Sequence, residues 1–529
     1  RLKLNAYGRK IVSDCGRPQI KLTVTYRQGR KEKTLRAKRR LAGQKSLCAP
    51  PAGIDLSQAG RCDFIAGPGN ACLAPFPNNF YTKKDGSSET GVRLDLDPES
   101  TPKAKPSTVY PEGKRIDVTA LNQSDGFSPG PLLSVRIPGM DNQPAFDRSG
   151  IVSITAMSRS FEPQQPVVLI DAESGERQLI WAELDSNAGA DRNRNLIIRP
   201  GKNLRNGHRY IVAIRNLKDA QGKAIAAPAG FRVYRDSDRT SNRVIENRRA
   251  HFESIFKTLK GAGIARKPLY LAWDFTVGST ENITGRMLSI RDRAFSELGD
   301  TDLTDGNGAT DGTAPGFQVN VDGVVDYPAV APGSGPGVEN IRTVTGTFQV
   351  PCFLDQPGCG PGSTFDLDEN QKPIRIAGNM MTARFTCNIP RSSVEGGEVV
   401  SKARPSLYGH GLFGTLNEVN STNVRQLGHE NGVMTCGTDW SGMSTLDVGT
   451  AAQALMDLSR FPALPDRLQQ GFLNFLYLGR LMIHEEGFTS NPALRFGDES
   501  VIDNSDLFYY GNSQGGIAGG ALTAIATDF

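Results

Sequence analysis

The chain has 529 residues, of which 38% are hydrophobic and 22% charged, a balance typical of folded globular proteins and not of disordered or fibrous ones. It is too long for a single hydrophobic core, so two to four domains are expected. No apolar run reaches the ~18 residues that a membrane-spanning helix needs, so the sequence predicts none.

The net charge of +5 hides an asymmetry. Residues 1–50 hold 15 Lys and Arg against two acids, a net +13, whereas the remaining 479 residues carry a net −8. The stretch "IKLTVTYRQGRKEKTLRAKRRL" alternates apolar and polar residues around Gln28-Gly29-Arg30, which predicts a solvated hairpin. A patch for polyanions or cell-surface acids is the alternative. Because Tyr26 is the only aromatic residue in this stretch of charges, no nucleic-acid partner is expected.

The chain divides into five segments, taken here in chain order. Residues 1–50 are interpreted as a basic β-hairpin segment at the end of a truncated β-domain. Residues 51–238 contain short β-branched runs such as "PVVLIDA", "NLIIRPG" and "RYIVAIRNL", with "GIVSITAM" and "FRVYRD" beside them, and predict a β-rich, Ig-like antiparallel sandwich. Residues 239–300 read as helix, strand and helix, a connection into the next domain.

Residues 301–369 are rich in Gly, Asp and Pro, as in "LGDTDLTDGNGATDGTAPG", and are interpreted as an insertion. Their Asp spacing weakly resembles calcium-binding turns but lacks the ligand pattern of an EF-hand. No cofactor is therefore expected, and a structural calcium ion is the only metal considered.

Residues 370–529 alternate between strand and helix patterns. The strands "SKARPSLYGHG", "GVMTCGTDW" and "DLFYYGN" are each followed by a helical stretch, and the longest of these is "PDRLQQGFLNFLYLGRLMIHEE". Such alternation predicts a mostly parallel sheet with helical crossovers.

A serine motif lies at the last of these strand-to-helix junctions. In Gly511-Asn512-Ser513-Gln514-Gly515 the serine would be the exposed nucleophile of a strained turn, with Gly511 and Gly515 avoiding clashes. A helix cap is the alternative for this serine.

A second motif, "YGHGLFGT", ends an earlier strand. Its loop would direct the backbone N–H of Leu412 at an acyl oxygen, and the N–H of Gln514 would be the second oxyanion donor. We expect His410, with Gly411 and Gly414, to support this loop and not to act as the base.

These two motifs resemble those of the α/β-hydrolase superfamily, on the side of secreted bacterial lipases and esterases. Segments such as "PFPNNFYT", "LYLAWDFTVGS" and "GTDWSGMS" are similar to large exported lipase-like proteins with an N-terminal Ig-like β-sandwich. The resemblance covers most of residues 70–529. It implies an α/β-hydrolase domain, truncated here after the nucleophile helix, and cleavage of an ester or lipid substrate through an acyl-enzyme.

The family order places an acid and a histidine after the serine, but no histidine follows Ser513. We therefore expect a missing C-terminal segment or a second chain to supply both. The upstream histidines are weaker candidates because none ends a strand; they are His208, His251, His429 and His484. Asp439 would either shape the pocket or be an ordinary loop residue.

Eight cysteines with local spacing favour four disulfides and an exported protein, either secreted, periplasmic or at the cell surface. The alternative is eight thiols, and eight cysteines allow 105 pairings. The expected pairs are Cys15–Cys48, Cys62–Cys72, Cys352–Cys359 and Cys387–Cys436.

A serine hydrolase acting on esters is thus the expected function. The first alternative is a serine peptidase, although no propeller repeats are present to gate a peptide substrate. The second is a non-catalytic surface or adhesion protein built on a hydrolase scaffold.

Overall fold

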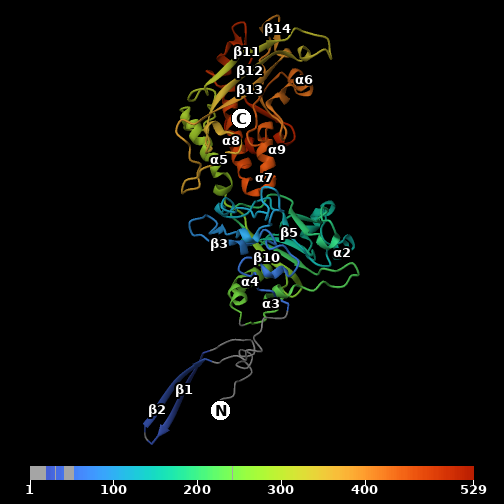
Figure 1. Ribbon diagram of the computed structural model, residues 1–529, viewed down its shortest axis with the longest axis vertical. Helices are drawn as coiled ribbons and strands as arrows, with labels where there is room; N and C mark the ends of the chain where they lie inside the picture. Colours follow the sequence, from blue (N-terminus) through green and yellow to red (C-terminus); the bar gives the residue numbers. More distant parts are fainter. Residues whose placement is uncertain (1–18, 30, 41–52, 241) are drawn as a thin grey trace. The chain divides into compact units, whose positions relative to one another are not determined.

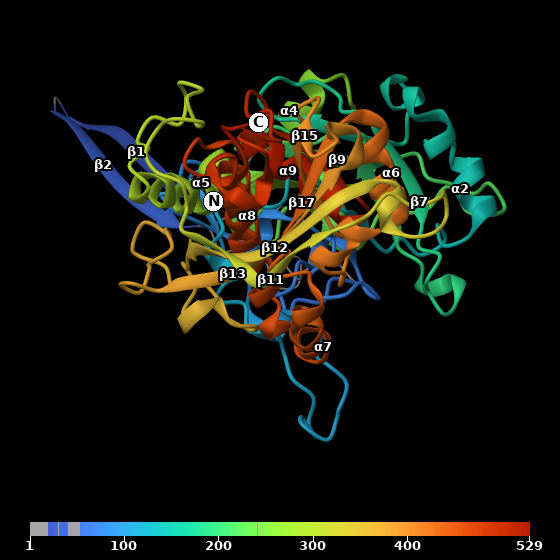
Figure 2. The same cartoon turned by 90° about the horizontal axis from the view of Figure 1, so that it is seen from above.

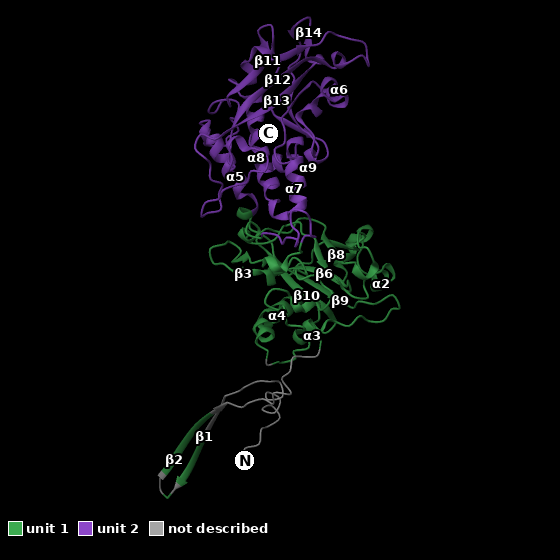
Figure 3. Ribbon diagram, viewed as in Figure 1, with its two compact units in different colours: residues 1–103, 118–282 green, residues 104–117, 283–529 purple. Residues whose placement is uncertain are grey.

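The computed structural model describes residues 19–29, 31–40, 53–240 and 242–529. Two compact units emerge, shown separately in Figure 3. The first comprises Arg1–Lys103 and Val118–Asn282, and the second comprises Ala104–Asp117 and Ile283–Phe529. The main boundary falls inside the region 239–300 that the sequence marks as a connection.

The basic segment forms the predicted hairpin. Strands β1 (Gln19–Gln28) and β2 (Lys31–Arg40) pair antiparallel, and Gly29 adopts a φ of 62° at the turn. Glycine reaches this left-handed conformation without a steric penalty. Val24 and Leu35 are exposed, so the hairpin is solvated on the face that carries its apolar residues.

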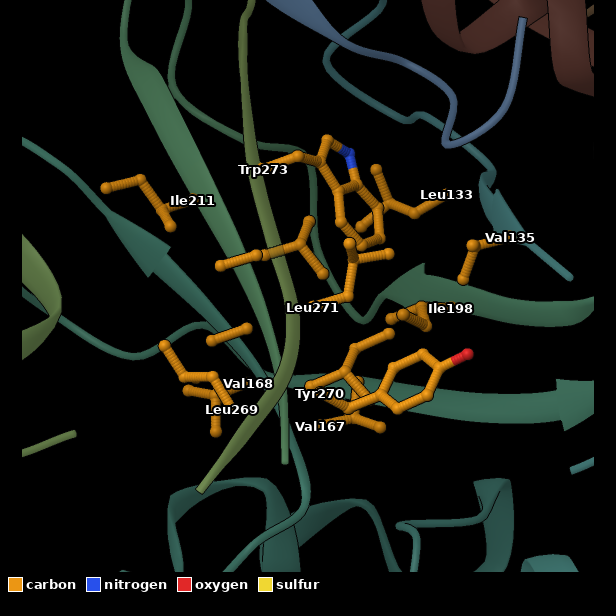
Figure 4. Close-up of a cluster of buried hydrophobic side chains, with 14 of the residues drawn as sticks. Leu133, Val135, Val167, Val168, Ile198, Ile211, Leu269, Tyr270, Leu271 and Trp273 are labelled. Carbon is orange, nitrogen blue, oxygen red and sulfur yellow. The ribbon is translucent and has the colours of Figure 1, made fainter. Parts of the chain in front are cut away.

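The first unit is built on two antiparallel sheets of three strands, in the orders β10-β9-β6 and β5-β8-β7. Side chains from both sheets meet in one buried cluster, and Figure 4 shows Trp273 and Leu271 of β10 near Leu133 of β5. The strands are β3 (Thr82–Lys84), β4 (Val92–Leu94), β5 (Leu133–Val135), β6 (Val167–Asp171), β7 (Ile180–Leu184), β8 (Leu196–Pro200), β9 (Arg209–Arg215) and β10 (Leu269–Thr276).

The prediction of an all-β, Ig-like first region is wrong. "GIVSITAM" runs into 3₁₀ turns over Ile154–Phe161, and "FRVYRD" lies in a helix. That helix buries Phe231 and Tyr234, three residues apart, against Phe252 of the next helix. An apolar run this short fits the period of a helix as well as that of a strand, and packing in the fold determines which of the two forms. The helices of this unit are α2 (Gln143–Ser149), α3 (Ala229–Arg235) and α4 (Arg243–Gly261).

The second unit contains one six-stranded sheet in the order β11-β12-β13-β17-β16-β20. Its first three pairings are antiparallel, and only β17-β16 and β16-β20 are parallel. The prediction of a mostly parallel α/β-hydrolase sheet is therefore wrong; the sheet is mixed. Its strands are β11 (Phe317–Asp326), β12 (Asn340–Pro351), β13 (Met380–Pro390), β16 (Arg404–Gly409), β17 (Val433–Gly437) and β20 (Phe508–Gly511).

The source of this error is the region 301–369. Strands β11 and β12 lie within it, and β12 pairs with β13, so both strands extend the sheet beyond β13 (Figure 2). Turn residues on both sides mask the strand pattern of β12, yet its Val344, Phe348 and Val350 are fully buried in the core of the unit. The alternation of strand and helix begins only at β16, so it describes only part of the sheet.

Helices, labelled in Figure 1, and two small hairpins complete the second unit. Helix α8 is its centre: most of its side chains are buried, and it packs against β12, β16 and α9. No helix among the described residues is long and apolar enough to span a bilayer. The remaining elements are α5 (Thr280–Glu297), α6 (Thr422–Asn431), α7 (Val448–Met456), α8 (Ala463–Ile483), α9 (Gln514–Ile525), β14 (Val394–Glu395), β15 (Glu398–Val399), β18 (Arg495–Phe496) and β19 (Glu499–Ser500).

Three of the expected disulfides are present: Cys62–Cys72, Cys352–Cys359 and Cys387–Cys436. The fourth expected pair, Cys15–Cys48, lies outside the described residues. Since disulfides persist in oxidising compartments, the three bridges indicate a protein of the extracellular space or the periplasm.

Candidate active site

Two turns meet at the carboxyl ends of the parallel strands β16 and β20. Gly409 lies opposite Gly511 in the ladder, so both strands end at the same level. Immediately beyond, the Asn512 N–H donates to the Gly409 carbonyl at 3.1 Å and joins the turns. The ends of adjacent parallel strands are where α/β sheets commonly bind ligands.

Ser513 occupies the sharpest part of the second turn. Its backbone has φ 53° and ψ −122°, a conformation that costs a non-glycine residue of order 1–3 kcal/mol. The residue is exposed, it precedes the first residue of α9, and its side chain makes no capping hydrogen bond. The structure thus gives no support to the helix-cap alternative.

The two glycines of the motif are sterically required. A Cβ at Gly511 would lie 2.6 Å from the carbonyl carbon of Gly515. A Cβ at Gly515 would lie 2.6 Å from the His410 carbonyl oxygen and closer still to that of Gly409. The β20–α9 turn can therefore pack onto the end of β16 only when both positions lack a side chain.

The loop after β16 lies beside the serine. A Cβ built on Gly411 would be 3.5 Å from the Cβ of Ser513. Gly411 to Gly414 form a turn closed by a 3.0 Å hydrogen bond from the Gly414 N–H to the Gly411 carbonyl, and Phe413 takes a φ of 58° within it. Among the described residues, the N–H groups of Leu412 and Gln514 have no hydrogen-bond partner.

His410 supports this loop through hydrogen bonds. It is fully buried, its Nε2 accepts the Trp440 N–H at 2.8 Å, and its Nδ1 lies 2.7 Å from the Gly411 carbonyl oxygen. An acceptor at Nε2 and a donor at Nδ1 define a neutral imidazole protonated on Nδ1. Both nitrogens are occupied, so neither reaches Ser513.

Glu418 is a residue that the sequence analysis missed. Its Oε2 accepts the Gly411 N–H at 3.1 Å, and its Oε1 occupies the space that a Cβ at Gly414 would need. Burial, together with the Glu418 carboxylate, raises the pKa of Tyr408 to about 12. The local signal in "HGLFGTLNE" is weak: the Glu stands three residues after the cap Thr415, which places it in the first turn of the short helix Leu416–Asn420 but does not identify Gly411 as its partner.

Tyr509 of β20 anchors the serine turn. Its Oη donates to the Gly515 carbonyl at 2.6 Å, and its ring packs where a Cβ on Gly519 would collide with it. Burial raises the pKa of Tyr509, so the hydroxyl keeps its proton and remains a donor.

None of the chain's five histidines hydrogen-bonds to Ser513. His208 pairs with Asp171 and His251 with Asp274, both within the first unit. In the second unit, His484 is buried and its Nδ1 accepts the Glu486 N–H. His429 lies near the end of α6.

Asp439 stabilises the fold around the loop. One of its oxygens accepts the Leu416 N–H at 3.1 Å, and the other pairs with Arg384 at 2.6 Å. Over the described residues, no three His, Cys, Asp or Glu side chains are grouped so that they could hold a metal ion. The region 301–369 thus offers no such group for the calcium ion considered from its sequence.

A scan against protein-family models found no match, and neither did a search of curated proteins. The candidate site therefore stands on its own geometry.

Proposed function

We propose that the protein is an exported serine hydrolase that cleaves carboxylic esters through an acyl-enzyme on Ser513. The observation that carries the proposal is the exposed Ser513, held at φ 53° between β20 and α9. Backbone strain of this kind persists only where the surroundings impose it, and it is concentrated at functional sites.

In the proposed reaction the Ser513 oxygen attacks the ester carbonyl carbon and loses its proton to a base. The resulting oxyanion accepts hydrogen bonds from the N–H groups of Leu412 and Gln514. The tetrahedral intermediate collapses to the acyl-enzyme as the alcohol leaves with the proton, and water then releases the acid.

The proposal requires a base that is not among the contacts of Ser513. Since His410 is occupied at both nitrogens and no other histidine bonds to the serine, we propose that a further segment or a second chain brings the histidine and its acid. The missing partner and the missing base would then be the same segment or chain. Co-purification of a second chain, or an intact mass above that of this chain, would reveal it.

Ester and amide hydrolysis by the full-length protein test the proposal. We expect hydrolysis of acyl esters, little turnover of peptides, and a loss of at least about 10³-fold in Ser513→Ala. Ser505→Ala is the matched control, because Ser505 is an exposed serine on the same approach to β20. Faster turnover of peptides than of esters would favour the peptidase alternative, and no turnover of either would favour the binding-protein alternative.

A further inference from the structure

We propose that Glu418 is a positioning residue for the oxyanion loop, holding Gly411 so that the Leu412 N–H stays directed at the developing charge. This inference rests on the proposed function, because it assigns a task within that reaction. Glu418 would touch neither the substrate nor the reacting atoms.

Gly411 is held by hydrogen bonds on both of its peptide groups. Its N–H donates to Glu418 Oε2 at 3.1 Å, while its carbonyl accepts from His410 Nδ1 at 2.7 Å and from the Gly414 N–H at 3.0 Å. The peptide group between Gly411 and Leu412 is planar, so fixing this carbonyl fixes the Leu412 N–H in the opposite direction. Glu418 secures the other side of the same residue.

Glu418 is itself fixed by its backbone hydrogen bonds. Its N–H donates to the Thr415 carbonyl and its carbonyl accepts the Ser421 N–H, both at 3.0 Å. The turn that carries it is further held by the Leu416 N–H, which donates to Asp439. The carboxylate therefore reaches the loop from a turn that hydrogen bonds hold in place.

The loop is shaped around the Glu418 carboxylate. A Cβ at Gly414 would collide with Glu418 Oε1, and a Cβ at Gly411 would lie 3.9 Å from the same oxygen. The carboxylate thus occupies the space that a side chain at position 414 would need. The loop also lies beside the serine, since a Cβ built on Gly411 would be 3.5 Å from the Cβ of Ser513.

Three variants of the full-length protein test the inference: Glu418→Ala, Glu418→Gln and the control Glu430→Ala, which removes an exposed carboxylate from neighbouring α6. We expect Glu418→Ala to lower kcat by about 10- to 100-fold with KM within twofold, since a displaced oxyanion donor weakens transition-state binding alone. Glu418→Gln keeps an acceptor oxygen and should recover most of kcat. Glu430→Ala should match the wild type.

Hydrogen exchange of the peptide spanning residues 408–416 gives a readout that needs no activity. Faster exchange in Glu418→Ala, but not in Glu418→Gln, is the expected result. Unchanged exchange, or an equal loss of kcat in both Glu418 variants, would overturn the inference. If the wild type hydrolyses no ester, the proposed function fails and the catalytic task of Glu418 fails with it, whereas unchanged exchange in an active enzyme overturns the Glu418 inference alone.

Discussion

The two halves of the six-stranded sheet differ in both geometry and use. Strands β11 to β13 are antiparallel and 10 to 12 residues long, and none of the candidate site residues lies on them. Strands β16 and β20 are parallel, only six and four residues long, and end in the turns that hold His410 and Ser513. Parallel strands bring successive loops to one edge, so the short half can assemble a site that the long half only supports.

The seam between the two halves is the pairing of β13 with β17, and it gives the first prediction. Strands β13 and β17 pair over only three residues, and the fully buried Cys387–Cys436 bridge lies in the middle of that pairing. Replacing both cysteines with alanine should destabilise the protein by about 4 kcal/mol on the chain-entropy estimate for a loop of about 50 residues.

The control for this seam is the Cys352–Cys359 bridge, whose residues are only seven positions apart. Its double alanine variant should cost about 2.5 kcal/mol on the same estimate. Urea unfolding of both variants measures the difference. A seam variant no less stable than the control would contradict the larger stabilising effect expected for the bridge between β13 and β17.

The serine turn gives the second prediction. Gly515→Ala places a Cβ against the carbonyls of Gly409 and His410 and should cost roughly 2–3 kcal/mol through overpacking. Gly520→Ala, in the same helix α9 with open space around it, should instead stabilise by up to about 1 kcal/mol. Thermal unfolding measures both changes, and equal effects would refute the close packing of α9 against β16.

The smallest expected effect concerns the anchor of the turn. Tyr509→Phe removes the hydroxyl that donates to the Gly515 carbonyl and should cost about 1 kcal/mol. Tyr510→Phe on the same strand should change the free energy of unfolding by less, because Tyr510 is 39% exposed. Denaturant titration of the pair resolves the difference, and a cost at Tyr510 equal to that at Tyr509 would count against the anchor.

The comparison also explains which parts of the structure were predictable. The parallel half carries strong local signals: β20 ends in a Gly-x-Ser-x-Gly motif, and α8 is a long helix rich in apolar residues. The antiparallel half does not, because β12 lies among Gly- and Pro-rich turns and its pairing with β13 spans some forty residues. Pairings so distant in sequence leave no periodic trace in either strand alone.

The candidate site was predictable to the same degree. Ser513, Gly511 and Gly515 follow from one motif whose steric logic is local. Glu418 was missed because its role depends on a turn folding back seven residues onto Gly411. A catalytic base is identified by its three-dimensional contacts and not by a local motif. None of the five histidines hydrogen-bonds to Ser513.

The most direct test of the account is the reaction of the protein with a fluorophosphonate, followed by peptide mass mapping. The account predicts a single covalent adduct on the peptide that contains Ser513, and no adduct in Ser513→Ala. An unmodified wild-type protein, or an adduct elsewhere that persists in Ser513→Ala, would contradict the assignment of Ser513 as the nucleophile.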